Sequence, residues 1–162
     1  MKHTIFMLVE NQAGVLSKIT GLFSRRAFNI DSLAVGVTAD SNISRITIVA
    51  DGDEYVAEQI QKQVSKLIPV IEVKLLKENT YISRELALLK VKCNTTNRLE
   101  IVKIAELMGA KIIDVSVASI TLEMADISDN IETLNNLLKP YGIKEIVRTG
   151  MVAVEKGSIS GK

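Results

Sequence analysis

The stretch HTIFMLVENQAGVLSKITGLF, residues 3–23, changes its hydrophobic period in the middle. Residues 3–9 form a short run rich in β-branched and apolar residues, which predicts a buried strand. A loop at residues 10–14 follows. Apolar side chains then recur at helical spacing, at Val15, Leu16, Ile19, Leu22, Phe23 and Ala27. The stretch therefore predicts a strand, a short loop and an amphipathic helix.

The same pattern continues until a βαββαβ unit is complete. Two strands, a helix and a last strand are predicted at residues 29–40, 43–51, 52–68 and 70–76. The first two of these strands are joined by the turn ADSN, because Asp and Asn tolerate the backbone angles of tight loops. Asp53 and Glu54 suit the positive end of the second helix dipole, and Pro69 follows that helix.

The second half of the chain repeats this order. Its strand, helix, two strands, helix and strand are predicted at residues 84–93, 97–108, 111–117, 119–124, 129–139 and 142–154. Aligning Ile30 with Ile113 gives an offset of 83 residues (113 minus 30), and at this offset Asn11 falls on Asn94. The repeat is therefore positional as well as topological.

Two domains are expected, at residues 1–77 and 78–162, in an α+β fold of two tandem ferredoxin-like units. Each is an open antiparallel sheet with both helices on one face.

The first strand is apolar on both faces, yet helices cover only one of them. The second strand, at the sheet edge, lacks a lysine or proline that would discourage pairing. These features predict a homodimer through the first domain; the alternative is that the two halves of one chain cover each other.

Composition excludes several classes of function. The net charge is +1, from 20 basic and 19 acidic residues, and aromatic residues make up 4%, so we expect no nucleic-acid partner. One cysteine, Cys93, and one histidine, His3, provide neither a metal cluster nor a disulfide, so a cytoplasmic protein without metal is expected. The apolar run at the N-terminus is too short for a signal peptide or a membrane span. No phosphate loop, nucleophile elbow or acid–base pair indicates catalysis.

The loop before the first helix is the remaining candidate site. A helix N-terminus presents unpaired N–H groups that suit a carboxylate or phosphate. Gly14 permits close approach, and Asn11 offers a donor and an acceptor. Val15 and Leu16 add apolar surface, so an amino acid with a hydrocarbon side chain fits this chemistry. The alternative is that Asn and Gly are ordinary turn and cap residues.

The run MLVENQAGVLSKITGLFSRRAFNIDSLAVG, residues 7–36, closely resembles the N-terminal ACT domain of the small, regulatory subunit of bacterial acetohydroxyacid synthase (acetolactate synthase). The resemblance continues through SRITIV, RELALLKV, AKIIDVS and GIKEIVRTG to about residue 155. It is specific, because ACT domains at large share only a loose G-x-L pattern after the first strand.

This resemblance implies a regulatory subunit without an active site in branched-chain amino acid biosynthesis. The family's catalytic large subunit carries thiamine diphosphate, a divalent metal such as Mg and FAD, and no cofactor is expected on this chain. The small subunit activates it and confers feedback inhibition by valine or a related amino acid. The family's effector lies between two ACT domains. By position, Asn11, Gly14, Val15 and Leu16 are expected to contact it from one copy, and Asn29 and Ile30 from the other.

The second repeat is not expected to bind an amino acid. At the offset of 83, Asn97 replaces Gly14 and Ile112 replaces Asn29. In the family the C-terminal domain contributes to assembly with the large subunit. Two other functions stay open: a freestanding amino-acid sensor that controls another enzyme or a transcription factor, and a dimerisation module without a ligand.

Overall fold

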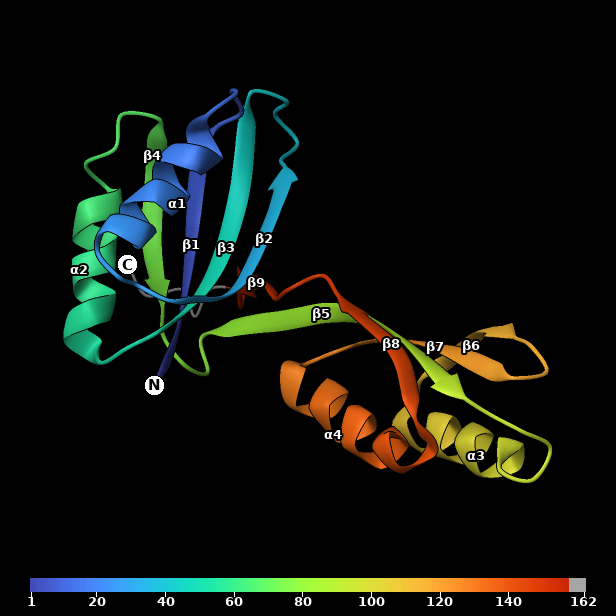
Figure 1. Ribbon diagram of the computed structural model, residues 1–162. Helices are drawn as coiled ribbons and strands as arrows, with labels where there is room; N and C mark the ends of the chain where they lie inside the picture. Colours follow the sequence, from blue (N-terminus) through green and yellow to red (C-terminus); the bar gives the residue numbers. More distant parts are fainter. Residues whose placement is uncertain (158–162) are drawn as a thin grey trace. The chain divides into compact units, whose positions relative to one another are not determined.

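A computed structural model describes residues 1–157 (Figure 1). The chain forms two compact units. The first contains Met1–Ile82 together with the segment that begins at Met151, and the second contains Ser83–Gly150. No helix within the described residues is long and apolar enough to cross a membrane.

The first unit contains the predicted βαββαβ order. Its elements are β1 (Lys2–Glu10), α1 (Val15–Arg25), β2 (Ile30–Val37), β3 (Ile43–Asp51), α2 (Glu54–Val64) and β4 (Val70–Leu76). The antiparallel sheet has the order β2-β3-β1-β4, and α1 and α2 cover one of its faces (Figure 1). This confirms the expected fold, including the edge position of β2.

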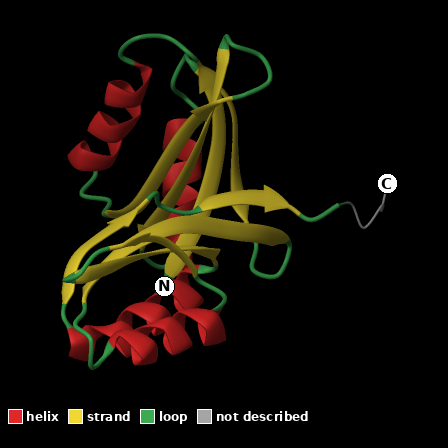
Figure 2. Ribbon diagram, turned by 90° about the vertical axis from the view of Figure 1, so that its right-hand side faces the viewer, coloured by secondary structure: helices red, strands yellow, loops and turns green. Residues whose placement is uncertain are grey.

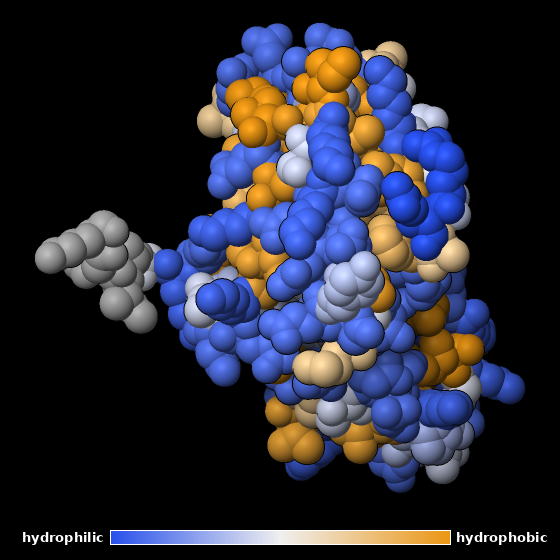
Figure 3. Space-filling view, turned by 90° about the vertical axis from the view of Figure 1, so that its left-hand side faces the viewer, coloured by the Kyte–Doolittle hydropathy of each residue, from blue (hydrophilic) through white to orange (hydrophobic). Residues whose placement is uncertain are grey.

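The core of the first unit lies between its sheet and its two helices. Ile5 and Met7 of β1 and Ile19 of α1 are fully buried there. The Asp53 carboxylate caps α2, because it accepts a hydrogen bond from the Val56 N–H at 2.8 Å. Outside the core, hydrophilic side chains alternate with small apolar patches on the surface (Figure 3). Scattered exposed apolar residues are normal for a protein surface.

The second unit has the same topology. Its elements are β5 (Tyr81–Lys92), α3 (Arg98–Met108), β6 (Lys111–Val115), β7 (Ser119–Asp126), α4 (Ser128–Leu138), a 3₁₀ turn η1 (Lys139–Tyr141) and β8 (Ile143–Arg148). The strand order is β6-β7-β5-β8, and β9 (Val152–Glu155) also pairs with β5. Helices α3 and α4 lie on one face of this sheet (Figures 1 and 2). The repeat predicted from the offset is confirmed as two ferredoxin-like units.

Several predicted element bounds were wrong. The single strand predicted at 142–154 is divided into β8 and β9, because Gly150 adopts a left-handed backbone with φ of +83° that breaks the strand. The first helix ends at Arg25, and Ala27, predicted on its apolar face, lies outside it with φ of +55°. The second helix ends at Val64 rather than near residue 68.

The segment 151–156, here called the C-terminal strap, lies on the face of the first sheet that the helices leave open. The Met151 N–H donates to Ser32 Oγ of β2 at 2.8 Å. Arg45 of β3 donates to the Ala153 carbonyl oxygen at 2.8 Å. On β4, Lys74 forms an ion pair with Glu155 of the strap at 2.6 Å. The strap therefore contacts three strands of the first sheet through polar groups.

An apolar cluster lies beneath the C-terminal strap. Phe6, Leu76 and Ala153 are all buried in it, and Leu8 and Tyr81 pack at its border. The guanidinium of Arg45 lies 4.1 Å from the centroid of the Phe6 ring, which is cation–π geometry. The strap thus covers Phe6 on the outer face of β1, while the homodimer and the alternative that the two halves cover each other both stay predictions. The strap also makes the compact units differ from the predicted domains 1–77 and 78–162, because residues from Met151 pack with the first unit.

Substituting Ala153 tests how much the C-terminal strap stabilises the first unit. Ala153→Glu would place a carboxylate against Phe6, so we expect the strap to detach and the free energy of unfolding to fall by about 1–3 kcal/mol. Urea denaturation measures this loss, and hydrogen exchange of the Met151 amide should become faster. Val154→Glu is the matched control, because Val154 is 57% exposed, and a change within about 0.5 kcal/mol is expected. Equal losses in the two variants would contradict this role of Ala153.

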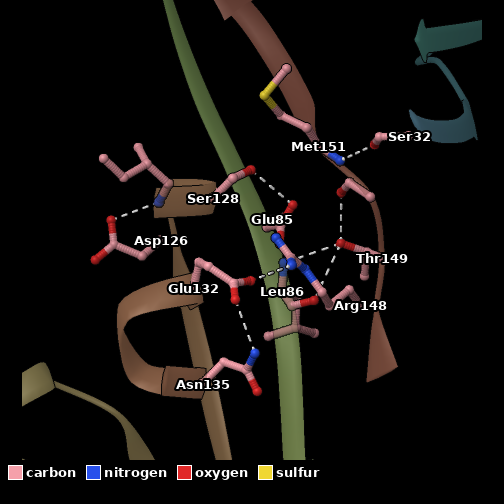
Figure 4. Close-up of polar contacts among 12 residues, drawn as sticks. Ser32, Glu85, Leu86, Asp126, Ser128, Glu132, Asn135, Arg148, Thr149 and Met151 are labelled. Atoms are coloured by element: carbon pink, nitrogen blue, oxygen red, sulfur yellow. Dashed lines mark hydrogen bonds and ion pairs between the residues drawn. The ribbon is translucent and has the colours of Figure 1, made fainter. Parts of the chain in front are cut away.

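A buried ion pair joins β5 and β8 in the second unit (Figure 4). The Glu85 side chain is 4% exposed, and its carboxylate accepts hydrogen bonds from the Arg148 guanidinium and from Ser128 Oγ. Arg148 also lies 3.4 Å from Glu132 of α4. The start of α4 is held separately, because Asp126 accepts from the Asn130 side chain and a backbone N–H, which lowers the pKa of Asp126. Polar contacts therefore join β5, β8 and α4.

Candidate functional site

The N-terminus of α1 presents free backbone donors. Gly14 is its N-cap residue, and no side chain caps the helix. The Val15 N–H donates to the Gln12 carbonyl oxygen at 3.3 Å, and the Lys18 N–H donates to that of Gly14 at 3.0 Å. Among residues 1–157, the N–H groups of Leu16 and Ser17 make no hydrogen bond to the loop, and both residues are exposed. Two adjacent N–H groups at the positive end of a helix are suited to a carboxylate.

Gly14 has a backbone that other residues adopt at a cost. Its φ is +84° and its ψ −8°, in the left-handed region. A Cβ built on Gly14 would meet no atom within 4 Å, so the space beside the helix entrance is open. The glycine is therefore explained by its backbone conformation, and it also leaves room for a ligand to approach.

The corresponding loop of the second unit is held by hydrogen bonds from its own asparagine side chains. Asn97, which matches Gly14, has an ordinary φ of −101°. The Asn94 Oδ1 accepts hydrogen bonds from the N–H groups of Thr96 and Asn97, both at 2.9 Å, and the Asn97 Oδ1 accepts from the Asn94 N–H at 2.8 Å. These side chains bond to the loop itself, but within the described residues the N–H groups of Leu99 and Glu100 at the start of α3 make no hydrogen bond to the loop, as at Leu16 and Ser17 of α1. The absence of an amino-acid site in the second unit therefore stays a prediction.

Asn11 is held by the turn between β2 and β3. Its N–H donates to the Asn42 carbonyl oxygen at 2.7 Å, and its Nδ2 donates to the Ser41 carbonyl oxygen at 2.8 Å. One of the two Nδ2 N–H donors of Asn11 is therefore used within the protein. Ser41 and Asn42 were not predicted to lie at the site, although the turn ADSN that contains them was predicted.

The two predicted halves of the site lie at opposite ends of α1. This helix has 11 residues, so it is about 16 Å long at 1.5 Å per residue. Asn29 follows its C-terminal end and donates through Nδ2 to Asp31 Oδ1 at 2.7 Å, while Ile30 packs against the core. Thus one chain brings Asn11, Gly14, Val15 and Leu16 together but not Asn29 and Ile30.

The predicted apolar contacts also differ in exposure. The Val15 side chain is buried in the core, whereas Leu16 is 40% exposed beside the free N–H groups. Leu16 is therefore the better placed of the two to contact a bound hydrocarbon chain. Within the described part of the chain, no group of three or more His, Cys, Asp or Glu residues is placed to hold a metal ion. The candidate site is thus suited to binding a small anion or zwitterion.

Both units match known protein families. Residues 5–72 match the model of the AHAS small subunit-like ACT domain, and residues 84–157 match the model named small subunit of acetolactate synthase. The acetolactate synthase small subunit of Mycolicibacterium smegmatis is 46% identical over 155 residues, which cover 96% of this chain and 91% of that protein. A probable acetolactate synthase small subunit of Archaeoglobus fulgidus is also 46% identical, and 98% and 99% of the two chains are covered.

A solved structure shows the same fold over nearly the whole chain. The acetolactate synthase small subunit from Thermotoga maritima matches with a TM-score of 0.91 and 37% sequence identity. The match covers 98% of this chain and 99% of that chain. The likeness therefore includes both units.

Proposed function

Because this chain belongs to the family of acetolactate synthase small subunits, we propose that it is the regulatory subunit of an acetohydroxyacid synthase. In this function it binds a catalytic large subunit, raises its activity and makes it sensitive to a branched-chain amino acid. The names of the relatives support the partnership with a larger subunit. The free N-terminus of α1 beside Gly14 is the observation that supports effector binding.

The effector in this proposal is valine, leucine or isoleucine. Its carboxylate accepts hydrogen bonds from the N–H groups of Leu16 and Ser17, in the open space beside Gly14. Its hydrocarbon side chain lies against the exposed part of Leu16. A hydrocarbon contact and a carboxylate contact on one helical turn distinguish such an effector from inorganic anions.

Two copies of the chain complete the proposed site. Asn29 and Ile30 lie at the far end of α1 from Gly14, so they reach the effector only from a second copy. The edge strand β2 is suited to this pairing, because Val35 and Val37 are exposed along it. The proposed assembly is therefore a homodimer through the ACT domains.

Catalysis is assigned to the large subunit in this proposal. Thiamine diphosphate, Mg and FAD would be held there, and this chain, in the cytoplasm, would supply regulation only. Effector binding inhibits only if the effector binds one arrangement of the dimer more tightly than another. Equal affinity for both arrangements would leave the equilibrium between them unchanged. The expected coupling between effector and activity is thus reciprocal: the large subunit in its active arrangement weakens effector binding.

Reconstitution with the large subunit tests this function. We expect the added chain to raise acetolactate formation several-fold, and valine, leucine or isoleucine to reverse that rise. Calorimetry of the chain alone should show binding of the same amino acid. Binding without stimulation of any large subunit would instead favour a freestanding amino-acid sensor. Absence of both stimulation and binding would leave the dimerisation module as the function.

A further inference from the structure

The turn between β2 and β3, residues 38–42, is braced by its own side chains. Asp40 Oδ1 accepts hydrogen bonds from the Asn42 N–H at 2.9 Å and from Asn42 Nδ2 at 3.1 Å. Thr38 Oγ1 accepts from the Asp40 N–H at 3.2 Å, and the Ile43 N–H donates to the Asp40 carbonyl oxygen at 3.0 Å. These bonds fix the peptide groups of the turn although the turn is exposed to solvent.

Two consecutive carbonyl groups of the turn 38–42 hold Asn11. The Asn42 carbonyl oxygen accepts from the backbone of Asn11, and the Ser41 carbonyl oxygen accepts from its side chain. Asn11 is three residues before Gly14, at the start of the loop that leads to the free N–H groups of α1. Asp40 fixes the conformation of Asn42 through its two hydrogen bonds. The directions of the Ser41 and Asn42 carbonyl groups depend on that conformation. The turn thus determines where this loop leaves β1.

The matching asparagine of the second unit forms different hydrogen bonds. Asn94, which matches Asn11, uses its side-chain oxygen to accept two N–H groups of its own loop. Asn11 instead uses its side-chain nitrogen to donate to another loop. In the second unit it is Arg98 that donates to the turn between β6 and β7, at the Ser116 and Val117 carbonyl oxygens, whereas in the first unit Asn11 itself donates to the turn 38–42.

We infer that Asn11 and Asp40 are positioning residues for the effector site: Asp40 fixes the turn 38–42, and the turn holds Asn11 so that the α1 N–H groups meet the carboxylate. This inference rests on the proposed function. It changes the role expected for the Asn11 side-chain nitrogen, which acts on the loop and not on the effector. It also adds Asp40, whose carboxylate contacts Asn42 and no residue of the loop itself.

Calorimetric titration of the full chain with valine, leucine and isoleucine tests the inference. Asp40→Ala should weaken binding of the effector about tenfold, the loss expected when a positioned donor pair becomes mobile. Asp40→Asn keeps an acceptor oxygen and should restore affinity to within about twofold of the unaltered chain. Asp126→Ala is the matched control, because Asp126 also accepts one backbone N–H and one Asn side chain, in the second unit. It should leave affinity unchanged.

A double-mutant cycle separates positioning from direct contact. Asn11→Ala alone should weaken binding about tenfold, and Asp40→Ala with Asn11→Ala should weaken it no further, because both changes break one connection. A direct contact from Asn11 Nδ2 would instead make the two losses multiply to about a hundredfold. Multiplying losses, or unchanged affinity in Asp40→Ala, would overturn the inference. If the unaltered chain binds none of the three amino acids, the proposed function itself fails, and the inference with it.

Discussion

A Gly14→Asp chain should still stimulate the large subunit, but feedback inhibition should disappear. The added carboxylate would occupy the open space beside Gly14, where the effector's own carboxylate is proposed to lie. Like charges in one site cost several kcal/mol, so effector affinity should fall at least a hundredfold. Acetolactate assays of the reconstituted enzyme, with increasing valine, leucine or isoleucine, measure this loss.

Two variants separate charge from backbone strain in this experiment. Gly14→Ala adds the cost of a left-handed backbone, about 1–2 kcal/mol, without the charge. It should weaken feedback much less than Gly14→Asp does. Asn97→Asp adds a charge at the matching position of the second unit and should leave feedback unchanged. Full valine inhibition in Gly14→Asp, with stimulation intact, would show that the effector binds elsewhere.

Arg148→Met should destabilise the second unit by about 2–3 kcal/mol. The Glu85 carboxylate would lose its cation while its side chain is only 4% exposed, and an unpaired buried charge is costly. The expected loss is at the low end for a buried pair because the Arg148 side chain is 34% exposed, so water can reach the site. Urea denaturation monitored by circular dichroism measures the change.

Two controls show whether the buried charge is the cause. Replacing both partners, as Glu85→Met with Arg148→Met, removes the unpaired charge and should recover most of the stability. Lys62→Met breaks an exposed pair with Glu58 on α2 and should cost no more than about 0.5 kcal/mol. A double variant less stable than Arg148→Met would indicate that packing around Glu85, not its charge, determines the result.

Hydrophobic periodicity predicted most of the fold. Strands β3 and β4 have the predicted bounds, because residues 43–51 and 70–76 are rich in Ile, Val and Leu and lie between clear turn signals. The break between β8 and β9 was missed, since the run GIKEIVRTGMVAV contains no signal stronger than a single glycine. The packing of the C-terminal strap on the first sheet could not be predicted, because its partners Ser32, Arg45 and Lys74 are far away in the sequence.

The candidate site was only partly predictable for a similar reason. The helix entrance at Gly14 follows from local pattern, and the structure places it as expected. The burial of Val15 depends on how α1 is rotated over the sheet, which the loop sequence does not specify. The contacts of Asn11 depend on carbonyl groups of the turn 38–42, and a carbonyl group is present at every residue, so no side-chain pattern marks it.

The C-terminal strap delays completion of the first unit during synthesis. Ser32 and Met151 are 119 residues apart in the chain, and Arg45 and Ala153 are 108 apart. The ribosome adds roughly 5–20 residues per second, so the 69 residues added after Ile82 up to Met151 (151 minus 82) take about 3–14 s. During this interval the outer face of β1, with Phe6, stays open to water and to other nascent chains. The βαββαβ part of the first unit is therefore synthesised several seconds before the outer face of its sheet is covered.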